Sequence, residues 1–270
     1  MNKKKLPTNN PEVEEKLKDK EIDILLLIYR YRFLDRNQIQ TLLNHKQFSR
    51  VIVWLNNLTE KKYLRRYYIK TIQSTPAIYS LGTKGRKYFI ENCKEYTIRK
   101  VSLLDRVWYE QANSYEFRSR MQLVANIYLS LLTLTKQTGA TLKFYTQVDL
   151  EGLKHLPKKL PDAFFSITEK NGTSKRFFLV LFRPYELEKK VEGVVRMYFS
   201  YYKYSNWQKN NPNPFPEIIF IAGEGKTKHI LENSIKYKLK KERKLVFSLS
   251  TKDAIQKNGI NKKVLEKVTV

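Results

Sequence analysis

The chain contains little of what several classes of protein depend on. Its 270 residues include one cysteine, nine glycines and nine prolines. The single thiol, Cys93, excludes an intramolecular disulfide framework and a zinc site built on cysteine pairs, and it favours a reducing compartment. The low glycine and proline content, with 41% hydrophobic residues, excludes intrinsic disorder. We therefore expect a folded, cytoplasmic protein.

Long apolar runs are also missing. A membrane-spanning helix needs about 20 predominantly apolar residues, and no uninterrupted run in the sequence approaches that length. The basic start, Met1 to Lys5, is followed by proline and glutamate where a signal peptide would need an apolar stretch. The sequence therefore predicts neither a membrane span nor a signal peptide.

Acidic residues are scarce relative to basic ones. The 52 lysines and arginines oppose 26 aspartates and glutamates, which gives a net charge of +26. The excess is spread along the chain, since residues 1–90 hold 19 basic and 8 acidic side chains and residues 91–270 hold 33 and 18. A charge this large repels itself unless a polyanion shares the surface. Nucleic acid is therefore the expected partner, ahead of an anionic membrane face.

Helical patterns occupy most of the first sixty residues. Apolar residues recur at helical spacing over 19–33 and again over 46–60. Between them, Asp35 has the side chain and the position to cap a short second helix. This spacing predicts three consecutive helices.

A predicted hairpin follows the three helices. Residues 63–70 alternate as a strand should, and residues 77–81 have the pattern of its partner. A further short helix is expected to begin at Thr83. Three helices, a two-stranded wing and a closing helix are typical of a winged helix-turn-helix, which we assign to residues 1–95.

Such a domain has a definite use for its polar side chains. The third helix fits the major groove of DNA, where amides and guanidinium groups contact base edges, and wing cations reach the phosphates or the minor groove. The predicted groove contacts are Lys46, Gln47, Ser49, Arg50 and Asn57. The predicted backbone contacts are Arg65, Arg66 and Lys70. The alternative is that these side chains form a solvated face of a domain that binds protein.

The second half of the chain alternates between strand and helix patterns. Residues 102–136 form a long helical pattern within a segment, 96–138, that we expect to link the domains, pack on the second core or dimerise. Short strands are predicted at 142–148, 163–168, 176–182, 217–222 and 244–249. Helices are predicted at 187–204, at 227–239 and in the last twenty residues. Residues 139–270 are therefore assigned to an α/β domain.

Particular residues carry a family resemblance. Leu-Pro-Asp-Ala-Phe at 160–164 is followed by a hairpin turn at 170–173, a strand at 177–180 and a helix with several tyrosines. With the preceding winged helix, this order resembles the replication-relaxation family of plasmids and other mobile elements over nearly the whole chain. The resemblance implies an α+β fold, with an N-terminal winged helix-turn-helix domain followed by an α/β restriction-endonuclease-like domain with a mixed central sheet.

The resemblance also implies where a nuclease centre would lie. Asp162 would be the first magnesium-binding carboxylate, and an acid and a lysine should follow on the next strand. The corresponding positions are Val180 and Phe182, which bind no metal. Glu188 and Lys190 supply an acid-x-Lys pattern later, at the start of the following helix. Asp162, Glu188 and Lys190 are therefore the only catalytic candidates, and we expect no catalysis, no metal and no cofactor.

The expected function is sequence-preferring binding of double-stranded DNA. The resemblance places it in the replication, conjugative transfer or transcriptional control of a plasmid or mobile element, with plasmid replication or transfer proteins as further partners and no membrane. A homodimer is expected because two-fold winged helices contact two half-sites, and the apolar stripe of 102–136 offers a dimer face. The alternatives are a metal-dependent DNA nuclease using Asp162 and a protein-binding scaffold.

Overall fold

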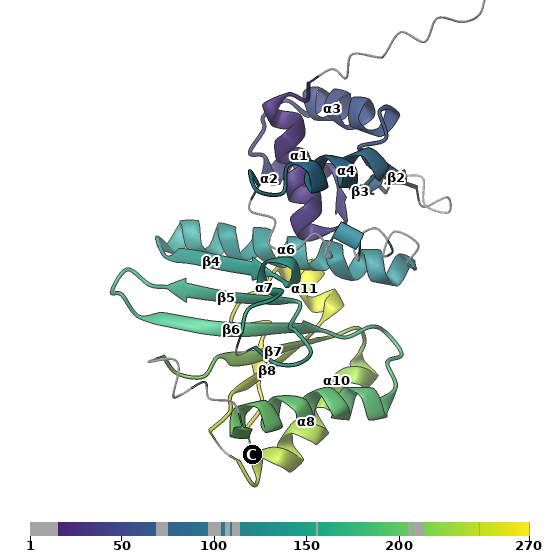
Figure 1. Ribbon diagram of the computed structural model, residues 1–270. Helices are drawn as coiled ribbons and strands as arrows, with labels where there is room; N and C mark the ends of the chain where they lie inside the picture. Colours follow the sequence, from purple (N-terminus) through teal and green to yellow (C-terminus); the bar gives the residue numbers. More distant parts are fainter. Residues whose placement is uncertain are drawn as a thin grey trace, which may run out of the picture.

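The computed structural model contains two units that follow each other along the chain (Figure 1). The described residues are 16–68, 75–96, 104–105, 109, 114–154, 156–204, 207, 213–242 and 244–269. The first unit consists of helices and a small antiparallel sheet, and the second contains a six-stranded mixed sheet with helices on both faces. This is the α+β architecture that the sequence predicts.

The first unit has the element order of a winged helix-turn-helix. Its elements are α1 (Asp19–Tyr31), β1 (Leu34–Asp35), α2 (Arg36–Leu42), α3 (Phe48–Glu60), β2 (Leu64–Tyr67), β3 (Ile78–Leu81) and α4 (Thr83–Glu91). The strands form an antiparallel sheet in the order β1-β3-β2. Helix α3 begins two residues later than predicted, at Phe48, and the wing strands are shorter than their sequence patterns.

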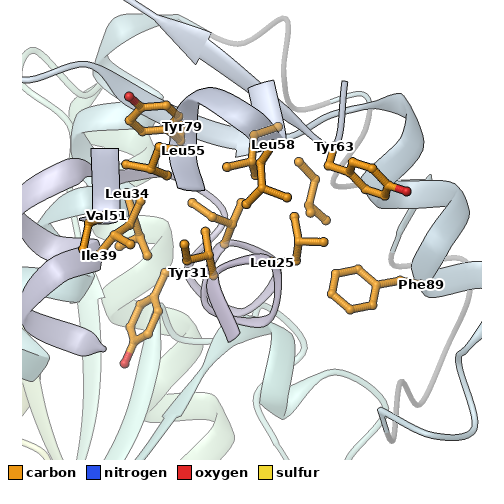
Figure 2. Packing of buried hydrophobic residues seen from close by; sticks show 14 of the residues in the cluster. Leu25, Tyr31, Leu34, Ile39, Val51, Leu55, Leu58, Tyr63, Tyr79 and Phe89 are labelled. Atoms are coloured by element: carbon orange, nitrogen blue, oxygen red, sulfur yellow. The ribbon is translucent and has the colours of Figure 1, made fainter. Parts of the chain in front are cut away.

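Local sequence explains how this unit forms. The Asp35 carboxylate accepts hydrogen bonds from the backbone N–H groups of Asn37 (2.8 Å) and Gln38 (2.9 Å), and the Gln38 side chain accepts one from the Asp35 N–H (3.0 Å). This capping box fixes the start of α2, as predicted. Apolar side chains of the three helices then meet in one core with Leu34 and Phe89, which Figure 2 shows.

The second unit is a three-layer α/β domain. Its elements are α6 (Tyr115–Thr138), β4 (Thr141–Thr146), α7 (Gln147–Leu150), β5 (Ala163–Thr168), β6 (Ser174–Leu181), α8 (Glu188–Tyr204), β7 (Glu217–Ala222), α10 (Gly225–Leu239), β8 (Phe247–Thr251), α11 (Lys252–Asn258) and β9 (Glu266–Lys267). The strands lie in the order β4-β5-β6-β7-β8-β9, with β6, β7 and β8 parallel and the remaining neighbours antiparallel. Helices α8 and α10 cover one face, and α6 and α11 cover the other.

The C-terminal end of the chain differs from its prediction. A helix was expected through the last twenty residues, but α11 ends at Asn258, where Gly259 follows at φ +67°. The chain then returns to the sheet, and Glu266 and Lys267 pair with β8. The helical prediction is wrong here because a sheet edge was available to residues whose own pattern is ambiguous.

Helix α6 belongs to both cores. Ala125 packs in the winged-helix core, while Ile127 and Leu131 pack in the core beneath the sheet. The predicted helix began at 102, whereas α6 begins at Tyr115, and part of the intervening segment lies outside the described residues. From Met121 to Leu131 the apolar stripe that suggested a dimer face is thus buried within the chain, and a homodimer stays a prediction without the support of that stretch.

Polar contacts also hold the two units together. Arg30 donates from Nε to Asp149 Oδ2 (2.9 Å) and from Nη2 to the Phe144 carbonyl (2.5 Å). Gln38 Nε2 donates to Asn126 Oδ1 on α6 at 2.7 Å. These contacts join α1 and α2 of the winged helix to α6, β4 and α7, so the two units have a defined mutual orientation. Among the described helices, none combines the length and the apolar character that crossing a membrane requires.

Candidate nucleic-acid interface

Helix α3 has one buried face and one exposed face. Val51, Leu55 and Leu58 are fully buried in the core. Ser49, Arg50, Val53 and Asn56 are exposed, and Lys46 and Gln47 are exposed just before the helix begins. Four of the five residues predicted to enter the major groove therefore lie on one exposed surface.

The fifth predicted groove residue, Asn57, is placed differently. Its side chain is half-buried, and Nδ2 donates a hydrogen bond to Glu21 Oε1 at 2.5 Å. Glu21 is 3% exposed and also accepts from the Lys18 N–H at 3.0 Å. Asn57 satisfies a buried carboxylate and fixes α3 against α1. An acidic residue within the α1 pattern is the sequence signal that such a partner was needed.

The wing continues the exposed surface of α3. Arg65 and Arg66 are both exposed on β2. Arg66 Nη1 donates to Asn56 Oδ1 at 3.0 Å, and its guanidinium lies 5.2 Å from the centre of the Tyr68 ring. Burial raises the pKa of the nearby Tyr79 hydroxyl, and Arg66 opposes that effect only in part. Lys70, the remaining predicted contact, lies outside the described residues.

These side chains form what we term the recognition face. It consists of Lys46, Gln47, Ser49, Arg50, Val53, Asn56 and Arg66. Arg65 is the neighbour of Arg66 on β2, so its side chain points to the other face of the wing. The amides, hydroxyl and guanidinium groups match the donors and acceptors of base edges and phosphates, and the exposed Val53 methyl groups match a thymine methyl. Asn56 was not predicted from the sequence. Its position seven residues after Ser49, on the same side of the helix, is the signal that would have found it.

Asp162 directly precedes β5, an inner strand of the second sheet, and both of its carboxylate oxygens have partners in the protein. Its side chain is 2% exposed, and Arg120 Nη2 lies 2.7 Å from Oδ1 and 2.8 Å from Oδ2. The Leu181 N–H donates to Oδ2 at 2.7 Å. Burial acts to lower the pKa of Arg120, but the Asp162 carboxylate reverses this and leaves it raised, so the guanidinium stays charged. A cationic side chain thus occupies the place where a metal would contact this carboxylate.

The other two catalytic candidates do not complete a metal site. Glu188 and Lys190 are exposed in the first turn of α8. Lys190 Nζ lies 3.7 Å from Glu186 Oε1, and Arg183 Nε lies 3.3 Å from Glu186 Oε2. Burial would raise the pKa of Glu186, but Arg183 and Lys190 outweigh it and leave the pKa lowered. No group of three histidine, cysteine or acidic side chains suited to a metal occurs within the described ranges.

The positions that would carry the second acid and the lysine are apolar and buried. Val180 is 6% exposed and Phe182 is 8% exposed, and both pack in the core beneath α8 and α10. The Phe182 ring lies 5.4 Å from that of Phe220. At these two positions the strand therefore stabilises the second core instead of presenting ligands.

Comparisons with protein-family models, with curated proteins and with solved structures find no match for this chain. The resemblance to the replication-relaxation family accordingly stays a prediction from the residues and their order.

Proposed function

We propose that this protein binds double-stranded DNA with sequence preference, through the recognition face, and that it does not cleave the DNA. Base edges are contacted by α3 and phosphates by Arg66 of the wing. The predicted family resemblance supports a role for this binding in the replication, transfer or transcriptional control of a plasmid or other mobile element.

The continuity between α3 and the wing is the observation that carries the proposal. Arg66 joins the two through Asn56, and the exposed surface bears Arg50, Arg66 and Lys46 without an exposed acid among its members. The net charge of +26 supplies the long-range attraction that such a surface needs. A protein that bound this same face would need to be strongly acidic to match it.

The test begins with selection of preferred duplexes from a random library, followed by anisotropy titrations with the selected duplex and a scrambled one. We expect Arg50→Ala to weaken binding to the selected duplex by about 5- to 150-fold and to leave scrambled DNA less affected, because one base contact is worth about 1–3 kcal/mol. Arg66→Ala should weaken both duplexes equally and reduce the salt slope by about one.

A matched control uses exposed lysines elsewhere. Lys240 and Lys241 follow α10, on the sheet face opposite to α6, and their replacement by alanine should leave the preference for the selected duplex unchanged. If six to ten phosphates are contacted, affinity should fall by roughly 10³ to 10⁵ between about 50 and 200 mM salt. Absence of any preferred duplex would overturn the proposal, and Mn²⁺-dependent cleavage would overturn its non-catalytic part.

A further inference from the structure

An open groove lies at the end of the six-stranded sheet away from Asp162. It has a volume of about 1200 Å³ and is bounded by the C-terminal half of α6, by β5, β6, β7 and β8, and by the segment 260–267. Asp162 adjoins the start of β5 and the end of β6, whereas the groove lies at the opposite ends of those strands. The groove is therefore separate from the site discussed above.

The floor of the groove is apolar and only partly covered. Phe165 and Phe177 stack with ring centres 4.8 Å apart, and Ile219 and Ile260 are buried beside them. Phe177, Ile167, Leu134 and Leu265 are half-buried, so part of their apolar surface faces solvent. Helix α6 ends at Thr138 while the β5–β6 hairpin continues past it, as Figure 1 shows. The sheet face is thus left open at this end.

The rim of the groove is basic. Lys170, Lys175, Lys262, Lys263 and Lys267 are exposed and line it. Two acids also line it, but both have partners, since Glu169 Oε1 lies 3.8 Å from Lys175 Nζ and Glu217 accepts a hydrogen bond from the Ser248 hydroxyl. The mouth therefore presents a net positive charge around an apolar floor.

We propose that this groove binds an acidic amphipathic helix of a partner protein. Apolar side chains at i, i+3, i+4 and i+7 bury against the floor, and carboxylates on either side of that stripe face the lysine rim. The phosphates of duplex DNA could pair with the lysines of the rim, but DNA has no apolar stripe to bury against the floor. The apolar floor therefore favours a protein helix over DNA as the ligand. This site is independent of the recognition face.

The probe is a synthetic, fluorescein-labelled helical peptide with leucines at that spacing and mainly glutamates elsewhere. One control peptide replaces the leucines by alanines at the same charge, and a second replaces the glutamates by lysines. Anisotropy at about 150 mM salt should show saturable binding of the acidic leucine peptide, with both controls at least about tenfold weaker. Equal binding of the alanine peptide would overturn the proposal, because net charge alone would then explain the binding.

Matched charge reversals locate the site. Lys262→Glu with Lys263→Glu should weaken peptide binding at least about tenfold, whereas Lys240→Glu with Lys241→Glu, after α10 on the opposite face of the sheet and not part of the groove lining, should have little effect. Equal effects of the two pairs, or displacement of the peptide by duplex DNA, would overturn the proposal. The Arg50→Ala variant should bind the peptide normally, so failure of DNA binding and failure of the groove are distinguishable.

Discussion

Asp162 and Arg120 form a buried ion pair whose removal should be costly. Arg120→Met leaves a carboxylate that is 2% exposed and whose remaining hydrogen-bond partner, among the described residues, is the Leu181 N–H. We expect the free energy of unfolding to fall by about 3–5 kcal/mol, since an unpaired buried charge is strongly destabilising. Urea denaturation at pH 7 measures this.

The double variant separates the charge effect from lost packing. Arg120→Met with Asp162→Asn removes both charges and should recover more than half of the lost stability. If single and double variants unfold at the same urea concentration, the pair does not act as described.

The Tyr198 hydroxyl is a second buried polar group. Tyr198 is 1% exposed, and its hydroxyl has no hydrogen-bond partner within the described part of the chain. Burial raises its pKa well above the ordinary value, with Asp162 adding to the effect. Between the unfolded pKa of about 10 and the higher folded pKa, only the unfolded chain ionises, so stability falls as the pH rises.

Tyr198→Phe should therefore leave stability at pH 7 unchanged or raise it by up to about 1 kcal/mol. It should also lose less stability than the wild-type protein between about pH 9 and pH 11. Thermal unfolding over this range provides the measurement. An identical alkaline loss in both proteins would contradict the assignment of the effect to Tyr198.

Helix α4 packs so closely on the chain before β2 that a side chain at Gly85 would be overpacked. A Cβ on Gly85 would lie 2.3 Å from the Tyr63 carbonyl oxygen, whereas a Cβ on Gly193 in α8 meets nothing within 4 Å. Gly193→Ala should raise the free energy of unfolding by about 0.5–1 kcal/mol through helix propensity. Gly85→Ala should instead lower it by about 1–3 kcal/mol through overpacking. Parallel urea titrations compare the two variants. A higher free energy of unfolding for Gly85→Ala would contradict the prediction and show that α4 moves to make room for the methyl group.

Elements with strong local signals were predictable from the sequence. The Asp35 cap, the β5–β6 hairpin with Gly172 at φ +83°, and the boundaries of β5 and β7 follow from residue types that favour one conformation. Side-chain contacts between residues far apart in the sequence were not predictable. Asn57 pairs with Glu21 across two helices, and the Arg120–Asp162 pair joins residues 42 positions apart. A buried acid such as Glu21 signals that a partner is needed, but no local pattern shows which distant residue supplies it.

At the scale of the whole molecule, α6 should make the two units unfold together. Because its residues belong to both cores, neither unit can lose α6 without exposing apolar surface. Variants that keep only Trp54, in the winged helix, or only Trp207, in the core beneath α8, report on each unit separately. We expect both fluorescence signals to share one urea midpoint, and two separated midpoints would contradict a shared core.

The Arg120–Asp162 pair also limits how this domain can change over evolutionary time. To bind a metal at Asp162, a descendant would need to lose Arg120 and to gain an acid at the position of Val180. If Arg120 is lost before the acid is gained, the buried Asp162 carboxylate is left without its cation. If the acid at position 180 comes first, it replaces Val180, an apolar core residue that is 6% exposed. Each single step crosses an unstable intermediate. The buried pair therefore makes a metal site at Asp162 difficult to gain by single substitutions.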